Sequence, residues 1–293
     1  FIGLAAKYNG LDVAQTDKAI ILSCPSYISR VLQSLGWGTP GSKEATTDYN
    51  ASPLPTDAVT TIYENAGPAE GSPEHYALEE KNGSFRKLLG ELLYAYVLCR
   101  VDTGYSVTTI SKYSSCPHQV HYHLLKAIAI YMRRTINWGI VYQRQSSNPS
   151  LPPYVPFHLP TQGDLPDFPV SSFPRELLCF VDAAHANDLR NRRSTTGYGI
   201  TMQGGVISYR STTQTITATS STEAEFIAAV TAAKQVKYLR FILRDLSLPI
   251  LAPTPIYEDN MSAIQMVNAR IPTDRSRHID IQHFAIQDWK EAG

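Results

Sequence analysis

The stretch Leu177-Leu178-Cys179-Phe180-Val181-Asp182 decides the fold of the second half of this chain. Five consecutive apolar residues suit a short strand buried in a sheet, and an acidic residue closes the run. Two more apolar stretches follow, residues 197–202 and 206–210, on either side of Gln203-Gly204-Gly205. This pattern predicts a β-hairpin next to the first strand.

Helices are expected to follow the hairpin. Ser220 or Ser221 can cap the first of them. Residues 255–257 predict another strand, which ends at Glu258-Asp259. Strands followed by alternating helices predict an α/β fold in which helices flank a sheet. The remaining helices are expected at residues 235–246, 260–267 and 279–290.

Four acidic residues stand out because of their places in this pattern. Asp182 ends the first strand, Glu225 lies in the first turns of the helix after the hairpin, and Asp259 closes the last strand. Asp280 falls in the first turn of the final helix. Strand ends and the helices above them converge on one edge of an α/β sheet, so the four carboxylates could meet there. An Asp at a strand end is more often a cap or turn residue than a ligand, and spacing alone leaves both readings open.

A cluster of carboxylates requires cations, because like charges a few Å apart raise one another's pKa. Mg²⁺ prefers oxygen ligands and keeps several of its waters. Two such ions about 4 Å apart activate a water on one side of a phosphodiester and stabilise the leaving oxygen on the other. If the four acids meet, the expected chemistry is therefore cleavage of a phosphate ester.

A proline-rich segment, residues 145–175, separates this half of the chain from the first. Proline removes backbone donors and favours extended chain, so the segment is expected to be a linker. A length of 293 residues also favours two domains, here residues 1–144 and 176–293. Because the first residue is Phe1 and not Met, the chain is expected to be a piece of something longer.

The first half carries two strong helical patterns. Apolar residues recur at helical spacing in residues 84–98 and 118–134. Between them and the short strands at the start, residues 39–79 are rich in Pro, Gly and Thr and are expected to form a long surface loop.

Composition limits the possible partners. The hydrophobic content of 43% suits a globular protein, and no apolar run reaches the roughly 18 residues that a membrane span needs. With 26 basic and 26 acidic residues the formal net charge is zero, so nucleic-acid binding must rest on local basic clusters. The four cysteines lack the spacing of a zinc site and are expected to be reduced thiols in an intracellular protein.

Several motifs of the second half resemble the ribonuclease H domain of Ty1/copia-type retrotransposons. They stand in the family's order over more than a hundred residues, which makes the series far more specific than any single motif. The motifs are FVDAA from Phe180, RRSTTGY from Arg192, SSTEAEFIA from Ser220, IYEDNMSAI from Ile256 and RHIDI from Arg277.

The resemblance implies a ribonuclease H-like mixed sheet with flanking helices. It implies hydrolysis of the RNA strand of RNA–DNA hybrids with two Mg²⁺ ions, for which Mn²⁺ can substitute. The implied metal ligands are the four acids that position had singled out, and a histidine two residues before the last of them could contact the scissile phosphate, help the product leave or simply pack. These residues are Asp182, Glu225, Asp259, Asp280 and His278.

Two glutamates compete for the place of the catalytic one. In ribonuclease H enzymes the ligand glutamate directly precedes an apolar pair and an alanine, which here is Glu225 before Phe226-Ile227-Ala228. Residues two apart on a helix differ by about 200° in direction, so Glu223 and Glu225 cannot both face the same metals. Glu223 is then expected to be a surface or capping residue.

The first half also resembles the same polyproteins. FRKLLG from Phe85, RVD from Arg100 and YMR from Tyr131 are similar to the reverse transcriptase beyond its polymerase site, although Val101 replaces a usual proline. A smaller α+β thumb/connection region is therefore expected to precede the nuclease. The paired-Asp polymerase motif would precede Phe1, so this chain alone should not synthesise DNA and needs the N-terminal polymerase part as partner.

Two basic clusters could hold the hybrid through its phosphates. One follows the first strand and the other precedes the last helix. Small polar groups near the acids could contact the RNA 2′-hydroxyls. The residues concerned are Arg192, Arg193, Arg275 and Arg277 for phosphates, and Ser221, Thr222 and Asn260 for hydroxyls.

Other interpretations remain open at this stage. The chain could be a noncatalytic retrotransposon relic that acts as a nucleic-acid-binding module, or another nuclease or integrase on the same fold. It could also cut only when joined to the missing polymerase part. The family context implies an intracellular location in a cytoplasmic virus-like particle.

Overall fold

The structure is a computed structural model that divides the chain into two compact units, Phe1–Pro169 and Val170–Gly293. The first unit was expected to be the smaller but is the longer of the two. The predicted linker, residues 145–175, lies wholly outside the described residues, so the domain boundaries remain predictions. The structure describes residues 6–16, 18–37, 52–55, 57–143, 177–269 and 280–291. For residues 280–283 it describes the backbone alone.

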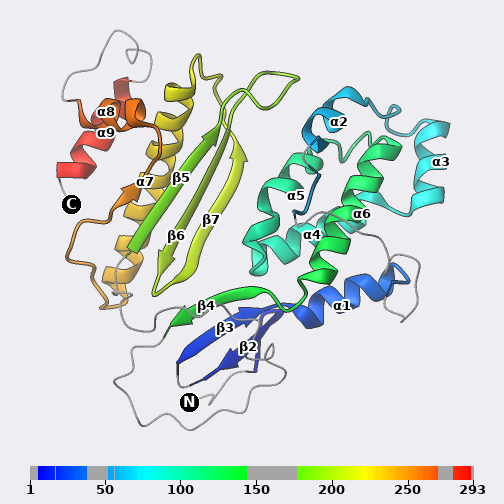
Figure 1. Cartoon of the computed structure of the whole chain (residues 1–293), viewed down its shortest axis with the longest axis horizontal. Helices are drawn as coiled ribbons and strands as arrows, with labels where there is room; N and C mark the ends of the chain where they lie inside the picture. The colour runs from blue at the N-terminus through cyan, green and yellow to red at the C-terminus, as the bar shows by residue number, and fades with distance from the viewer. Residues whose placement is uncertain are drawn as a thin grey trace. The chain divides into compact units, whose positions relative to one another are not determined.

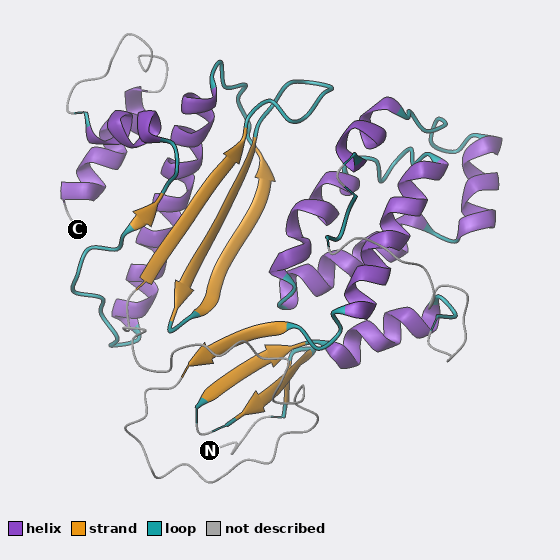
Figure 2. Cartoon of the chain, in the orientation of Figure 1, coloured by secondary structure: helices purple, strands orange, loops and turns teal. Residues whose placement is uncertain are grey.

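The first unit contains an antiparallel sheet in the order β1-β2-β3-β4 (Figure 2). Its last strand comes from far along the sequence and pairs Gly139 with Ser23. A Cβ atom at Gly139 would lie 2.3 Å from the carbonyl oxygen of Leu22, so only glycine permits this approach. The strands are β1 (Lys7–Tyr8), β2 (Leu11–Gln15), β3 (Ala19–Ser23) and β4 (Gly139–Gln143).

Helices make up the rest of the described first unit. Both predicted helices are confirmed: α4 follows Ser84, and α6 begins after the N-cap His118. The helices are α1 (Pro25–Ser34), α2 (Ala58–Glu64), α3 (Pro73–Asn82), α4 (Phe85–Leu98), α5 (Gly104–Ser111) and α6 (Gln119–Arg134), with a 3₁₀ turn at Val101–Thr103.

The prediction of one long loop over residues 39–79 is wrong where the structure describes that segment. Helix α2 lies within it because Ala58 and Ile62 are buried in the core. Helix α3 begins within it because Ser72 accepts a hydrogen bond from the backbone N–H of His75 and Pro73 occupies the first helical position. Proline therefore starts a helix here, where composition suggested irregular chain.

An ion pair between Arg100 and Asp102 lies in the turn between α4 and α5. The Arg100 side chain is 1% exposed, and its Nη2 lies 2.7 Å from Oδ2 of Asp102. Its Nε donates to the other carboxylate oxygen of Asp102 at 3.0 Å, and the guanidinium lies over the ring of Tyr131. Such a two-point pair satisfies a charge that would otherwise be costly to bury.

We expect Asp102→Ala to lower the free energy of unfolding by about 3 kcal/mol, because it leaves the Arg100 charge buried without its carboxylate. Chemical denaturation followed by circular dichroism would measure the loss. The double variant Arg100→Leu/Asp102→Ala should recover part of it, since no unpaired charge remains. A double variant no more stable than Asp102→Ala would contradict this account.

The four cysteines are free thiols. Two of them, which are far apart in the sequence, meet in the core of the first unit: the side chains of Cys24 and Cys99 form a hydrogen bond with each other. Nothing in their spacing indicated this contact.

The second unit holds a mixed sheet in the order β7-β6-β5-β8 (Figure 1). Strands β5, β6 and β7 are antiparallel to one another, whereas β5 and β8 run parallel. The expected mixed sheet with flanking helices is thereby confirmed. The strands are β5 (Leu177–Ala184), β6 (Thr195–Met202), β7 (Gly205–Thr213) and β8 (Ile256–Tyr257).

The predicted hairpin forms between β6 and β7. Met202 pairs with Gly205, which leaves Gln203 and Gly204 as a two-residue turn. Both have positive φ, 52° and 80°, the conformation that suits the twist of the strands. Gly205, expected in the turn, is the first residue of β7.

One long helix, α7 (Ser221–Asp245), packs on this sheet, where two helices were predicted. No Gly or Pro interrupts residues 221–245, so nothing breaks the helix near the expected boundary at Gln235. Ala224, Ala228 and Ala232 are fully buried at four-residue spacing and let the helix approach β5 closely.

Helices α8 (Met261–Asn268) and α9 (Asp280–Glu291) complete the described second unit and pack beside α7 (Figure 1). Ile286 of α9 contacts the side of α7 that carries Phe226 and Val230. Both helices confirm their predicted segments within a residue or two. Among the described helices of the whole chain, none combines the length and apolar character that crossing a bilayer requires.

Candidate metal centre

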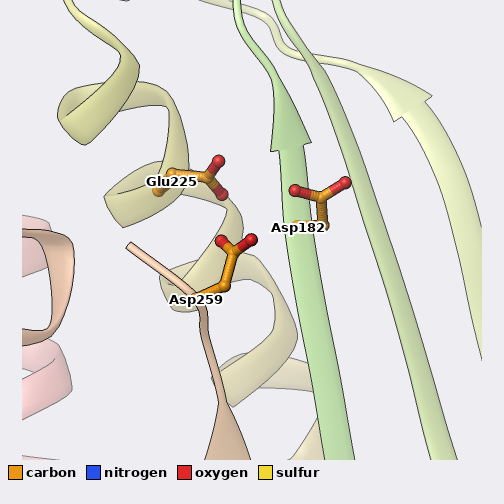
Figure 3. Close-up of side chains that lie close together, drawn as sticks. All are labelled: Asp182, Glu225 and Asp259. Carbon is orange, nitrogen blue, oxygen red and sulfur yellow. The ribbon is translucent and has the colours of Figure 1, made fainter. Parts of the chain in front are cut away.

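Three carboxylates from three separate elements converge at one edge of the second sheet. They belong to Asp182 on β5, Glu225 on α7 and Asp259 in the turn after β8. Each offers an oxygen, and these oxygens all lie within 4.8 Å of one another. Figure 3 shows the three side chains pointing toward a common centre.

Strand register explains how two of the acids meet. In the parallel pair β5 and β8, Phe180 lies opposite Tyr257. Asp182 and Asp259 each come two residues later, so they leave the sheet at the same level. Because β8 stops at Tyr257, the edge of β5 is open beyond this point.

The third acid, Glu225, belongs to helix α7. Glu225 lies in the second turn of α7, between the buried Ala224 and Phe226, and is itself only 7% exposed. Its carboxylate accepts a hydrogen bond from the backbone N–H of Ala183, a group on the open edge of β5. The strand that was expected to end at Asp182 continues to Ala184 and supplies this donor.

Burial and neighbouring charges both act on Glu225. Burial is the largest cause that raises the pKa of its carboxyl from 4.5 to about 8. The negative charges of Glu258, Asp182 and Asp259 raise it further, in that order of strength, and the bond from Ala183 acts in the opposite direction. One carboxylate oxygen, Oε2, is buried without a hydrogen-bond partner.

These features fit a hard divalent cation. Carboxylate oxygens are the ligands that Mg²⁺ prefers, and a cation would both neutralise the mutual repulsion and give the free Oε2 of Glu225 a partner. Asp182 and Asp259 are exposed, so the site is open on one side to water and to a substrate.

The structure separates the two competing glutamates. Oε2 of Glu223 accepts hydrogen bonds from the backbone N–H and the hydroxyl of Thr219, at 2.7 and 2.6 Å. The backbone N–H of Glu223 in turn donates to the N-cap Ser220. Glu223 thus caps α7, as expected, but it is buried and not on the surface.

We expect Glu223→Ala to lower the free energy of unfolding by about 1 kcal/mol, the usual cost of a lost helix cap. The rise in melting temperature produced by Mg²⁺ should stay as in the parent protein, because Glu223 does not face the three acids. Thermal unfolding with Mg²⁺ and with EDTA would measure both effects. Loss of the Mg²⁺-dependent rise in this variant would instead identify Glu223 as a ligand.

Three polar residues predicted to contact RNA lie at helix starts. Ser221 and Thr222 are the first two residues of α7, the former exposed and the latter half-buried. Asn260 is the N-cap of α8, and its Oδ1 accepts a hydrogen bond from the backbone N–H of Ala263 at 3.0 Å. Asn260 therefore has a structural role beside any contact with substrate.

Arg192 and Arg193 are exposed in the loop between β5 and β6. The buried Asp188 organises this loop through its backbone: its carbonyl accepts from the N–H of Arg192, and its N–H donates to the carbonyl of Arg193. The backbone of Arg192 has a positive φ of 56°. An ordered turn thus presents both guanidinium groups to solvent.

The other predicted site residues lie outside what the structure describes. Arg275, Arg277 and His278 fall in the gap before α9. Asp280 is the first residue of α9, but its side chain is not among those described. Three of the four predicted ligands are therefore seen together, and Asp280 remains a prediction.

One acid near the centre was not among the predicted ligands. Glu258 immediately precedes Asp259, and it is the charged residue that acts most strongly on Glu225. In a continuing strand, neighbours such as Glu258 and Asp259 would point to opposite faces. The strand ends at Tyr257, so this alternation does not apply, and only the tertiary structure reveals the approach.

Comparison with known proteins places the chain in a family context. The retrovirus-related Pol polyprotein from transposon TNT 1-94 of Nicotiana tabacum is 28% identical over 295 residues, which cover 98% of this chain. The corresponding polyprotein from transposon RE1 of Arabidopsis thaliana is 26% identical over 71% of the chain. The chain's homologues are copia-type Pol polyproteins of plant transposons. It spans only 19% of the tobacco polyprotein and 12% of the Arabidopsis one.

Other matches are of different kinds. The secreted RxLR effector protein 161 of Plasmopara viticola is 28% identical over 159 residues, which cover 54% of this chain and 93% of that protein. No protein-family model matches. Among solved structures, LC11-RNase H1 isolated from compost matches 41% of this chain and 78% of its own, with a TM-score of 0.31 and 15% identity. A likeness of that size adds nothing to the functional argument.

Proposed function

We propose that the second unit is the ribonuclease H of a copia-type Pol polyprotein, which hydrolyses the RNA strand of RNA–DNA hybrids with two Mg²⁺ ions. The observation that carries the proposal is the convergence of Asp182, Glu225 and Asp259, with a buried carboxylate oxygen of Glu225 left free. The relation to Pol polyproteins supports a ribonuclease H-related role.

In this proposal the three acids hold the cations, and each has a distinct part. Glu225 is fixed by α7 and by the backbone N–H of Ala183, so its free oxygen is aimed at the centre. Asp182 and Asp259 are exposed and line the side from which a phosphate would approach. Bound Mg²⁺ would supply polarisation of the phosphate and activation of water, and Mn²⁺ can take its place.

Other residues would hold the hybrid. The exposed guanidinium groups of Arg192 and Arg193 suit contacts to phosphates, for which their ordered turn is favourable. Ser221, Thr222 and Asn260 are proposed to contact 2′-hydroxyls, the groups that distinguish RNA from DNA. Arg275, Arg277 and His278 are proposed to contact phosphates near the last helix.

The first unit is proposed to be the thumb/connection region of a reverse transcriptase. Its partner would be the polymerase part of the same polyprotein, since this chain covers a fraction of its relatives' length. An intracellular location in a virus-like particle belongs to the same proposal.

The decisive experiment is cleavage of an RNA–DNA hybrid in which each strand carries its own label. We expect Mg²⁺-dependent cutting of the RNA strand alone, no cutting of single-stranded RNA or of duplex DNA, and no cutting in EDTA. A folded protein that binds the hybrid but cuts neither strand, with Mg²⁺ or Mn²⁺, would overturn the proposal in favour of a noncatalytic binding module. Cutting of duplex DNA would indicate a different nuclease.

A further inference from the structure

Glu258 occupies an unusual place beside the three-carboxylate centre. It follows the last residue of β8 and precedes Asp259, and its side chain is half-buried. Oε1 accepts a hydrogen bond from the backbone N–H of Asn260 at 3.0 Å, which anchors the carboxylate at the start of α8. Oε2 is buried and has no hydrogen-bond partner.

A role as a turn residue does not account for this arrangement. A carboxylate that only capped the turn could use one oxygen and leave the other in water, at no cost. Here the second oxygen is removed from water and left unsatisfied, which is unfavourable unless something binds it. The same holds for Oε2 of Glu225, a side chain that is 7% exposed and on which the charge of Glu258 acts, so two interacting acids each have a buried oxygen without a partner.

The charges lead to the same conclusion. Each carboxylate close to the centre offsets part of the charge of the cations that it would hold. Glu258 acts on Glu225 more strongly than Asp182 or Asp259 does, and it is itself affected by both of these aspartates. Glu258 thus adds a negative charge beside the centre, where it would attract a divalent cation.

We propose that Glu258 is a further metal-binding residue of this centre, and that its free Oε2 contributes to the binding of a second divalent cation. The inference rests on the proposed function of the site and adds a ligand to it. Glu258 is not in the group of acids whose oxygens all approach within 4.8 Å, so it would hold the second ion at the flank of that group.

The test is a titration of the metal-free protein with Mn²⁺ at neutral pH, monitored by electron paramagnetic resonance and by calorimetry. The parent chain is expected to bind two ions. Glu258→Gln keeps the oxygen that accepts a hydrogen bond from the N–H of Asn260 but removes the charge. It should lower the affinity for the second ion by at least about tenfold. Glu258→Asp retains the charge on a shorter side chain and should lose less affinity for the second ion than Glu258→Gln.

A matched control removes one carboxylate elsewhere on the same unit. Asp245 lies 20 residues after Glu225 on α7, roughly 30 Å along the helix, and its side chain is 73% exposed. Asp245→Asn should bind two ions with the affinities of the parent. Circular dichroism of each variant confirms folding, so that a lost ion is not mistaken for a lost fold.

The outcomes separate this inference from the proposed function. Two ions bound equally by the parent and by folded Glu258→Gln would overturn the role of Glu258 and leave the three-acid site standing. One ion bound by the parent would overturn the second-ion role as well. No Mn²⁺ bound by the parent would overturn both the inference and the metal centre on which it rests.

Discussion

Asp259→Asn is expected to lower Mg²⁺-dependent cleavage of the RNA strand by about 10³-fold or more, equivalent to roughly 4 kcal/mol of transition-state stabilisation. Asp182→Asn should have an effect of the same size, because each variant removes one of the three converging carboxylates. An amide keeps the shape of the side chain but loses the charge that holds a cation. Initial rates on a labelled hybrid, at saturating Mg²⁺, would measure the loss.

Binding of the hybrid should respond in the opposite direction. Without metal, an exposed carboxylate repels the phosphate backbone, so Asp182→Asn and Asp259→Asn should bind the hybrid in EDTA at least as tightly as the parent. A fall in cleavage accompanied by an equal fall in binding would indicate that these residues hold substrate or fold, not metal.

The same assay decides the role of Asp280. If it is the fourth ligand, Asp280→Asn should lose cleavage to the same extent as Asp259→Asn. A loss of less than tenfold would leave it as a residue of the first turn of α9 and remove it from the ligand set. Asp245→Asn is the control for a carboxylate distant from the centre.

Glu225→Gln is expected to make the metal-free protein more stable at pH 8.5, even though it removes a proposed ligand. The pKa of Glu225 is raised from 4.5 to about 8 in the folded protein, first by burial and then by neighbouring acids. Ionising this carboxyl therefore costs more in the folded state than in the unfolded state. A glutamine is neutral at every pH and avoids that cost, while its oxygen can still accept from the N–H of Ala183.

The sign of the pH dependence follows from the direction of the shift. Below about pH 4.5 the carboxyl is protonated in both states and adds no penalty. Between pH 4.5 and about 8 unfolding releases a proton, so the free energy of unfolding falls as pH rises, by at most about 1.4 kcal/mol per unit. Above about pH 8 the penalty is complete. Glu225→Gln should thus match the parent near pH 4.5 and exceed it by a few kcal/mol at pH 8.5.

Mg²⁺ should reverse the order of the two proteins. A bound cation offsets the charge of Glu225 in the parent, which therefore gains stability on addition of Mg²⁺, whereas Glu225→Gln gains little. Denaturant titrations at pH 4.5, 6.5 and 8.5, with Mg²⁺ and with EDTA, would show the crossing. If Glu225→Gln were less stable than the parent at every pH in EDTA, ionisation of Glu225 would not destabilise the folded protein as proposed.

Local signals in the sequence account for most of the second unit. The apolar run Leu177–Val181, the Gly-containing turn after Met202 and the capping residue Ser220 are each recognised from neighbouring residues. They fix the type of each element and place three acids at the ends of strands and the start of a helix. Helix α7 was expected as two helices, although residues 221–245 contain no Gly or Pro that would divide it.

Contacts between distant segments could not be derived in this way. The parallel pairing of β5 with β8 brings Asp182 and Asp259 to one level. Helix α7, which lies between these two strands in the sequence, must pack on the sheet for the strands to pair. The burial of Arg100 depends in the same way on a distant segment, because its guanidinium lies over the ring of Tyr131 on α6.

By itself, therefore, the sequence determined most elements of the second unit, the family resemblance and the identity of the acids, since each rests on residues close along the chain, whereas helix α2 and the start of α3 fell in a predicted loop. Only the tertiary structure decided which acids meet, that Glu225 is buried with a free oxygen, and that Glu258 stands beside it. The physical reason is that burial and charge coupling depend on distance in space, which the end of β8 and the packing of α7 establish together.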